Sequence, residues 1–408
     1  MTEKRKSPAL RFRGYSDDWE QRKLGDIVKE VTRNEPTTDA PIMMITANNG
    51  FIEQSERYAF NNAGESLKKY ILLEKGELAY NHGASKLRPY GSCFALTTRE
   101  NARIPFVYHC FSAAAQNSEF LSIELNGADV ENQLRRIVSS GARMDGLLNI
   151  SFQEYASVSV LLPSIKEQDK IASFFANIDN LITLHQLKLE KLKLVKKSML
   201  EKMFPKNGSN VPEVRFKGFT DDWEQRKVSD LAEKTYGGGT PTTSNEAYWN
   251  GDIPWIQSSD VMDGKLLGVE PRKWITQAGL NNSAAQLIPE NSIAIITRVG
   301  VGKLAFMPYS YATSQDFLSL SKLNAEPFFT VYACYKELQT GLNAVQGTSI
   351  KGITKDELLA KNIMVPRYAE QQQIGAFFKN LDHLNTLHQR KVEKLQILKK
   401  SMLEKMFV

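Results

Sequence analysis

The sequence predicts an α+β protein with two domains of mixed α/β structure in tandem. Each domain is followed by a long helix, and the two helices are expected to pack as an antiparallel coiled-coil spacer with pseudo-twofold symmetry. Two observations support this fold class. Two blocks of the sequence occur twice, and the second block has apolar residues at helical spacing in both copies. The length of 408 residues also fits two ordinary domains with connecting segments.

The first repeated block opens each copy. Residues 11–23 read RFRGYSDDWEQRK and return at 215–227 with three substitutions, displaced by 204 residues. The second block, residues 178–204, returns at 381–407, and both copies end in the same nine residues, KKSMLEKMF. The order is therefore opening motif, insert and helix, and then the same three again.

The inserts between these blocks differ from each other. Residues 28–140 and 232–346 share little beyond Phe-Leu-Ser at 120–122 and 317–319 and a strand-like ending in proline. A constant frame with divergent inserts favours two modules of different specificity. The alternative is a recent duplication drifting without purpose, but drift would erode the frame as readily as the inserts.

The repeated helices show heptad spacing, with Lys188 and Lys391 expected to interrupt the seam at equivalent places. Ser164 and Glu167 predict a capping box at the start of the first helix. We interpret His185 and His388 as polar seam residues that fix register, rather than as a pH switch or metal pair. The other predicted seam positions are Ile171, Phe174, Ile178, Leu181, Leu192, Val195 and Met199, with Ile374, Phe377, Leu381, Leu384, Leu395, Leu398 and Met402 in the second helix.

The predicted domain organisation follows from these blocks. The expected segments are an opening motif at 1–24, domain 1 at 25–163, helix 1 at 164–204, a linker with the repeated motif at 205–228, domain 2 at 229–366 and helix 2 at 367–408.

The composition is that of a globular protein without a membrane span, because no run of about 18 apolar residues occurs. The basic start lacks the apolar stretch of a secretory signal. Three scattered cysteines predict neither disulfides nor a zinc site and indicate a cytoplasmic location. The net charge of +6 permits nucleic-acid binding without requiring it.

The second insert contains the sharper candidate site. A glycine-rich loop at 237–244 offers backbone N–H groups and hydroxyls that suit phosphate oxygens, and the aromatic residues at 248–255 are expected to anchor it to the core. A buried strand at 293–296 then leads to Arg298 and Lys303, candidates for contacts with base edges or DNA backbone, unless they are ordinary surface cations. The candidate hydroxyl residues are Thr240, Thr242, Thr243 and Ser244.

In the first insert, a short strand at 78–80 leads into a loop with an amide, an imidazole and two cations. Asparagine pairs with adenine and arginine with guanine, so this loop is a second candidate reading loop. Its candidates are Asn81, His82, Ser85, Lys86 and Arg88. Segments that precede the closing strand of each insert add Arg143, Ser349 and Lys351.

The sequence lacks the usual catalytic signatures. We find no amino-methylation motif, no ATP-binding loop, no cofactor-binding glycine fingerprint and no metal-binding cluster of His or Cys. We therefore expect no catalytic residue, cofactor or metal in this chain, and we expect partner proteins to supply any chemistry.

Taken together, these motifs resemble the specificity subunits of type I restriction-modification systems. The resemblance covers nearly the whole chain. It rests on the opening motif Arg-Phe-x-Gly-[Tyr/Phe]-x-x-x-Trp, the Gly-Gly-Thr-Pro run, the Pro-x-x-x-Glu-Gln start of each helix and the Lys-Lys-Ser-Met-Leu ending. The first insert departs from the family pattern because it lacks the Gly-Gly-Thr-Pro run.

The resemblance implies that each insert is a target recognition domain for one half of a split duplex-DNA site. It implies two methyltransferase subunits that use S-adenosylmethionine to methylate adenine N6, and two restriction subunits that use ATP and Mg for translocation and cleavage. Two other classes remain open. One is a scaffold that binds protein or glycan, and the other is an enzyme with an unrecognised site. Binding to duplex DNA that weakens steeply with salt would exclude the first, and methyl transfer by the isolated chain would support the second.

Overall fold

The computed structural model describes residues 7–47, 50–57, 64–138, 147–206, 208–344 and 352–407. The chain divides into two compact units. Unit 1 comprises residues 1–183 with 393–408, and unit 2 comprises residues 184–392. Each unit therefore contains one insert and a stretch of both long helices.

Unit 1 begins with a strand from the opening motif that closes against the end of the insert. β1 (Glu20–Lys23) pairs antiparallel with β10 (Ser159–Leu162). The main sheet has the antiparallel order β2 (Lys29–Glu30), β9 (His109–Ser112), β6 (Leu78–Asn81), β7 (Ser92–Ala95). Two antiparallel ribbons accompany it, β3 (Met43–Thr46) with β4 (Gly50–Glu53) and β5 (Ile71–Glu74) with β8 (Asn101–Ile104). Its short helices are α1 (Ser118–Leu125), α2 (Ala128–Ile137) and α3 (Phe152–Ala156).

Unit 2 repeats this plan with an insert of nearly the same length. β11 (Glu224–Lys227) pairs with β19 (Asn362–Val365). The main sheet has the order β12 (Ala232–Gly237), β18 (Phe317–Leu323), β15 (Ser292–Ile296), β16 (Leu304–Met307). A second sheet contains β14 (Lys273–Ile275), β13 (Trp249–Ile256) and β17 (Ala312–Thr313), the last of which is parallel to β13. The helices are α5 (Gln277–Asn281), α6 (Pro327–Ala344) and α7 (Lys355–Leu359).

Short 3-10 turns connect several of these elements. They lie at Leu24–Asp26, Gln54–Glu56, Gly64–Lys69, Val228–Leu231, Glu246–Tyr248 and Ser258–Asp260.

The main sheets of the two units correspond strand by strand, although the insert sequences differ. In both sheets, alternate residues of the third strand are buried in the core that contains the tryptophan of the opening motif. These residues are Leu78 and Tyr80 in β6, with Trp19, and Ile293 and Ile295 in β15, with Trp223. The Phe-Leu-Ser match at 120–122 and 317–319 is not part of this correspondence, since the first copy lies on α1 and the second on β18. That part of the sequence comparison was wrong.

The structural counterpart of Phe120 is Phe329. Asn117 and Glu326 accept the N–H groups of Phe120 and Phe329, each at the start of its helix. The same two residues donate their own N–H groups to Gln168 and to Gln371, which occupy equivalent places in the repeat. The start of α1 therefore corresponds to the start of α6.

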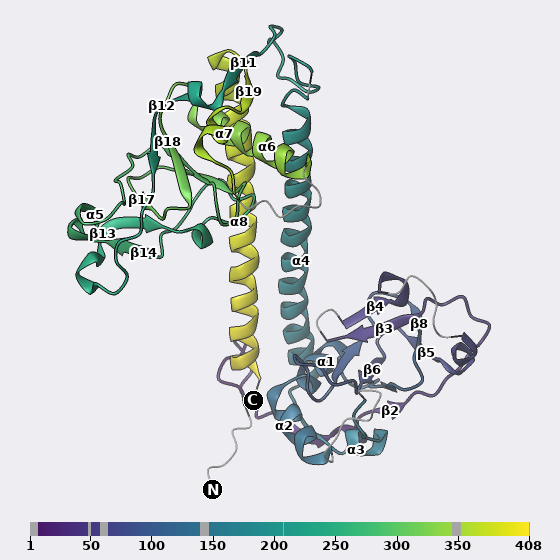
Figure 1. The fold of residues 1–408 in the computed structure, drawn as a ribbon. Helices are drawn as coiled ribbons and strands as arrows, with labels where there is room; N and C mark the ends of the chain where they lie inside the picture. The colour runs from purple at the N-terminus through teal and green to yellow at the C-terminus, as the bar shows by residue number, and fades with distance from the viewer. Residues whose placement is uncertain are drawn as a thin grey trace. The chain divides into compact units, whose positions relative to one another are not determined.

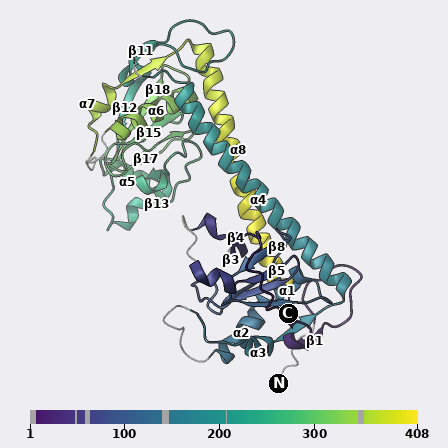
Figure 2. The ribbon, with the colours of Figure 1, turned by 90° about the vertical axis from the view of Figure 1, so that its right-hand side faces the viewer.

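The long helices are α4 (Ile165–Lys202) and α8 (Tyr368–Met406), drawn in teal and yellow in Figure 1 and from a second side in Figure 2. In unit 2 they run antiparallel, because Lys196 pairs with Asp382 while His185 contacts His388. In unit 1 the equivalent pair is Lys399 with Asp179. The predicted α+β class with a long helix after each domain is confirmed.

The seam between the helices differs in phase from the prediction. Leu189 and Val392 are buried in it, whereas Lys188 and Lys391 are exposed beside it. Leu181, predicted to lie in the seam, is 45% exposed, and the neighbouring Ile182 is buried instead. The lysines therefore flank a continuous seam and do not interrupt it.

The frame motifs form one charged contact in each unit. Arg11 donates two hydrogen bonds to the carboxylate of Glu167, at 2.9 and 2.7 Å, and Arg215 does the same to Glu370, at 2.7 and 2.8 Å. Both carboxylates are buried. The predicted capping box was wrong, because the carboxylate of Glu167 accepts from Arg11 of the opening motif rather than from the N–H of Ser164. This contact explains why the opening motif and the start of the helix are repeated together.

The second shared contact joins the two repeats. The buried Trp19 packs edge-on against Phe407, the aromatic residue that ends the second repeat, with ring centroids 6.0 Å apart. Trp223 packs in the same way against Phe204, which ends the first repeat, at 6.1 Å. The tryptophan in the opening motif of each repeat thus packs against the last aromatic residue of the long helix in the other repeat.

The seam histidines form a polar contact inside unit 2. The Nδ1 atoms of His185 and His388 lie 3.0 Å apart, a hydrogen bond in which one ring donates and the other accepts. Burial lowers the pKa of His388, and the positive charges of His185, Lys188 and Lys391 act in the same direction. Acid therefore opposes this contact.

We expect unit 2 to lose stability when the pH falls from about 7 to about 5. The pKa of His388 in the folded state lies below its unfolded value, which is near 6.5. The contribution of His388 to stability is therefore complete above the unfolded pKa and is lost as the pH falls through the folded-state pKa. The unfolding midpoint in urea, measured against pH, should fall less in His388→Gln than in the unchanged chain. Equal slopes would contradict this role of His388.

Candidate nucleic-acid interface

The two loops predicted to read DNA occupy the same place in their sheets. The loop after Asn81 joins β6 to β7, and the loop after Ile296 joins β15 to β16. Each therefore connects the third strand of its main sheet to the fourth. The sequence identified both loops separately, and the structure shows that they are counterparts.

A second segment of the chain returns beside each loop. The N–H of Leu148 donates to the carbonyl of His82 at 2.9 Å, and the N–H of Ile353 donates to the carbonyl of Thr297 at 2.8 Å. These contacts are equivalent, because His82 and Thr297 both follow the third strand. The predicted site residues Arg143, Ser349 and Lys351 lie outside the described residues.

Two of the candidate side chains in the first loop form hydrogen bonds within the protein. The side-chain amide of Asn81 donates to the carbonyl of Ile45 at 3.1 Å and accepts from the N–H of Gly83 at 2.9 Å. His82 is only 6% exposed, and each ring nitrogen lies 2.7 Å from a backbone carbonyl oxygen, that of Leu148 or Val107. The predicted contact of His82 with DNA therefore does not fit this structure, and His82 instead holds the loop to its neighbours.

The rest of this loop is more open. The hydroxyl of Ser85 accepts the N–H of Arg88 at 3.0 Å and closes a turn. The guanidinium of Arg88 donates to the carbonyl of Asn126 at 2.8 Å, which directs it toward α1. Lys86, between them, is exposed and stays a predicted DNA contact.

The second loop presents Arg298 at an exposed turn. Gly300 and Gly302 both have φ of +91°, a conformation that favours glycine, so the chain can reverse within a few residues. Lys303 is half-buried and its aliphatic stem lies next to Gly300. Arg298 is therefore the better placed of the two predicted cations.

The glycine-rich loop differs from its interpretation as a phosphate cradle. A Cβ on Gly238 would collide with Ser314, and a Cβ on Gly239 would collide with the backbone of Ala284 and Ala285. The N–H of Gly239 donates to the carbonyl of Thr313 at 2.8 Å, so it is not available to a phosphate. These two glycines allow close packing, and the predicted phosphate contact does not fit the N–H of Gly239.

The aromatic residues after this loop anchor it, as predicted. The indole N–H of Trp255 donates to the carbonyl of Gly239 at 3.0 Å, and that of Trp249 donates to the carbonyl of Thr242 at 3.2 Å. The hydroxyl of Thr240 donates to Gln315 at 2.6 Å. The remaining hydroxyl candidates are exposed and stay predictions, namely Thr242, Thr243 and Ser244.

The sequence reasoning missed a set of exposed apolar residues on the long helices. Apolar residues exposed along a helix are typical of surfaces that bind other proteins. The signal was present as leucine and isoleucine residues beyond those assigned to the seam, and three residues assigned to the seam, Leu181, Leu384 and Leu398, are exposed as well. On α4 they are Leu181, Leu184, Leu187 and Leu194, and on α8 they are Leu384, Leu387, Ile397 and Leu398.

The part of the chain that the structure describes contains neither a cluster of metal-binding side chains nor a helix suited to a membrane. No three side chains of His, Cys, Asp or Glu there are grouped so that they could hold a metal ion. None of the helices described combines the length and apolar character needed to cross a bilayer.

Comparison with known proteins places these features in a family. The family model for the type I restriction modification DNA specificity domain matches twice, at residues 16–194 and 220–396. The MjaIX specificity subunit of Methanocaldococcus jannaschii is 27% identical over 190 residues, 45% of this chain and 42% of that protein. The EcoR124I/EcoR124II specificity subunit of Escherichia coli is 30% identical over 161 residues, 37% and 39% of the two chains. The chain thus spans about two fifths of the length of these two relatives.

Solved structures support the fold. The type I restriction-modification S subunit from M. genitalium matches with a TM-score of 0.62 at 11% identity, covering 98% of this chain and 99% of that one. A chain from a structure of type I restriction-modification complex assembly matches with a TM-score of 0.50 at 16% identity, covering 95% and 97%. With matches over most of both repeats, the chain belongs to the specificity-subunit family of type I restriction-modification systems, and it carries the DNA specificity domain of that family twice.

Proposed function

We propose that this chain reads a bipartite DNA target, with each recognition domain contacting one half-site. The observation that carries this proposal is the pair of counterpart loops, at 82–91 and 297–303, which have unrelated sequences on matched sheets. A constant frame with two different loops suits the reading of two different half-sites. Exposed Lys86 and Arg298 supply cations that suit phosphate or base edges.

The proposal includes partner proteins. The exposed apolar residues of α4 and α8 suit the docking of protein subunits along the helices. We propose that methyltransferase subunits, which modify adenine N6 with S-adenosylmethionine, and restriction subunits, which use ATP and Mg, assemble on this chain in the cytoplasm. The chain itself would then be the non-catalytic recognition part of the complex.

The direct test is to express the chain with its methyltransferase partner and to map methylated adenines across a genome. We expect methylation at a single split sequence with a fixed gap. In binding assays, affinity for duplex DNA should fall steeply as salt rises, because phosphate contacts release counterions. Methylation at continuous or random sequence would contradict the proposal.

Replacing Arg298 with alanine should relax base preference in one half-site and leave the other unchanged. A bidentate contact between arginine and guanine contributes roughly 1–3 kcal/mol of discrimination, or about 5- to 150-fold. The measurement is methylation of a library of sites randomised in both halves. Arg226→Ala is the matched control, because Arg226 is an exposed arginine on β11 that pairs with Glu224. Unchanged preference in both halves, with the fold intact, would remove Arg298 from the interface.

A further inference from the structure

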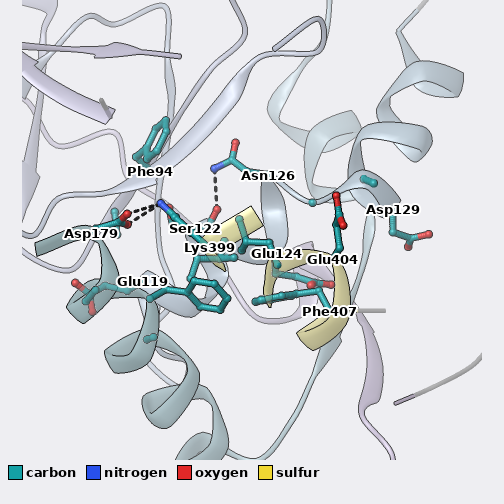
Figure 3. Close-up of a pocket in the computed structure, with 18 of the residues that line it drawn as sticks. Phe94, Glu119, Ser122, Glu124, Asn126, Asp129, Asp179, Lys399, Glu404 and Phe407 are labelled. Atoms are coloured by element: carbon teal, nitrogen blue, oxygen red, sulfur yellow. Dashed lines mark hydrogen bonds and ion pairs between the residues drawn. The ribbon is translucent and has the colours of Figure 1, made fainter. Parts of the chain in front are cut away.

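Unit 1 contains a cleft beside the ion pair that joins its stretches of the two long helices. The cleft has a volume of about 500 Å³ and lies where β7 and α1 meet the ends of α4 and α8 that belong to this unit. Figure 3 shows Lys399 and Asp179 among the residues that line it, and the lysine Nζ lies 2.6 and 2.7 Å from the carboxylate oxygens. These side chains remain 33% and 51% exposed.

In unit 2 the equivalent ion pair is covered by the chain itself. Lys196 and Asp382 are only 10% and 14% exposed. The carbonyl of Gly264 accepts a hydrogen bond from Lys196 Nζ at 3.1 Å, and the hydroxyl of Tyr332 donates to Asp382 at 2.7 Å. The counterpart of Tyr332 is Ile123, which lines the cleft and has no hydroxyl.

The same loop of unit 2 also covers a strand edge. The N–H of Phe306 in β16 donates to the carbonyl of Leu266 at 2.9 Å. Two carbonyls of this loop, two residues apart, are therefore used as acceptors. That of Gly264 accepts from Lys196, and that of Leu266 accepts from the edge strand β16. The side chain of Leu266 is buried in the core of unit 2.

Unit 1 has the matching strand edge without this cover. Ala95 pairs with Leu78 as Phe306 pairs with Ile293. The N–H of the next residue, Leu96, donates to the carbonyl of Glu77, so by the alternation of antiparallel strands the N–H of Ala95 faces away from β6. Ala95 lines the cleft, and its N–H has no acceptor among the described residues.

The outward N–H and carbonyl of the neighbouring Cys93 are already bonded to Asn126, so the open part of this edge is at Ala95. From this correspondence we propose that the cleft binds an extended segment of a partner polypeptide, which pairs with the end of the β7 edge at Ala95. One carbonyl of the segment accepts from the N–H of Ala95, and the carbonyl two residues before it accepts from Lys399 Nζ. An apolar side chain on the residue whose carbonyl accepts from Ala95 takes the place that Leu266 has in unit 2. Addition of a strand to an exposed sheet edge is a common mode of peptide recognition.

The charges of the cleft define the partner further. Its lining includes two cations, Arg88 and Lys399, the second of which is paired with Asp179. Carboxylates outnumber them, so the bound segment carries lysine or arginine, and a DNA phosphate is disfavoured. The carboxylates are those of Glu119, Glu124, Asp129, Asp179 and Glu404.

The test uses a displayed library of random peptides, about twelve residues long, selected against the full chain. We expect enrichment of peptides with an apolar residue flanked by lysine or arginine. Ala95→Pro removes one outward N–H from an edge strand, where proline is tolerated, and should weaken the enriched peptides about 10-fold in fluorescence anisotropy. Ala95→Ser keeps the N–H and is the matched control. Glu119→Lys leaves the strand intact and should also weaken them.

Several outcomes would overturn the proposal. They are a selection without enrichment, enrichment of acidic peptides, or affinities that neither Ala95→Pro nor Glu119→Lys alters. Self-association of the chain that Ala95→Pro abolishes, measured by sedimentation, would assign the cleft to a second copy. Weaker binding of a labelled DNA duplex by Ala95→Pro, with the fold intact, would assign it to DNA. Neither of the last two results concerns whether the chain reads a bipartite target, which the methylation map decides separately.

Discussion

Replacing Arg215 with alanine is expected to lower the free energy of unfolding of unit 2 by about 3–5 kcal/mol, because it leaves the buried carboxylate of Glu370 without its partner. Glu370 is 1% exposed, and the guanidinium supplies two hydrogen bonds to it. The hydrogen bond to Glu370 raises the pKa of Arg215, so the arginine stays charged throughout the accessible pH range. The same change at Arg11 should destabilise unit 1, where Glu167 is equally buried.

Urea unfolding of the full chain measures the change in the free energy of unfolding. Calorimetry of the same variants shows whether the transition of unit 1 or that of unit 2 has shifted. The matched control is Arg226→Ala, whose ion pair with Glu224 is exposed on both sides and should contribute about 0–1 kcal/mol. The double variant Arg215→Ala, Glu370→Leu should recover part of the loss, because it removes the orphaned charge. Similar effects at Arg215 and Arg226 would show that burial of Glu370 does not decide the stability of this contact.

The frame was predictable from the sequence because repetition made it visible. The heptad pattern identified both long helices, and the near-identity of the opening motifs identified a shared structure. Which residues contact each other was less accessible. Glu167 has the spacing of a capping residue, but a cation more than 150 residues away in sequence binds it more strongly than a backbone N–H can. The seam was misassigned because Leu181 and Ile182 both fit a helical stripe, and only packing selects the second.

The position of the candidate site was predictable from the sequence, but which of its side chains are exposed was not. A short strand followed by polar residues located both loops. The sequence alone could not show that the two loops are counterparts, because β6 and β15 share burial pattern rather than residue identity. Nor could it distinguish His82, whose ring is enclosed by two carbonyls, from Lys86, which is exposed four residues later. That difference depends on the fold around the loop, which brings Val107 and Leu148 together.

Inserting one heptad into both long helices should change the gap of the DNA target more than any single substitution in the loops. The insertions belong after Lys188 and after Lys391, which are exposed and equivalent in the repeat, so that the seam keeps its phase. Seven residues lengthen a helix by about 10 Å. In the proposed function the paired helices set the spacing of the half-sites, so the gap should grow by up to about 3 base pairs. Methylation at the original gap should fall at least about 100-fold.

The measurement is methylation of a library in which both half-sites are fixed and the gap varies. An insertion of the same seven residues into the linker after Ser209 is the control, because it lengthens the chain without lengthening either helix, and it should leave the gap unchanged. Insertion into α4 alone should abolish modification at every gap, since it moves Lys196 away from Asp382 and His185 out of register with the seam around His388. If the double insertion still modified the original gap, some element other than the helices would have to set the distance between the half-sites.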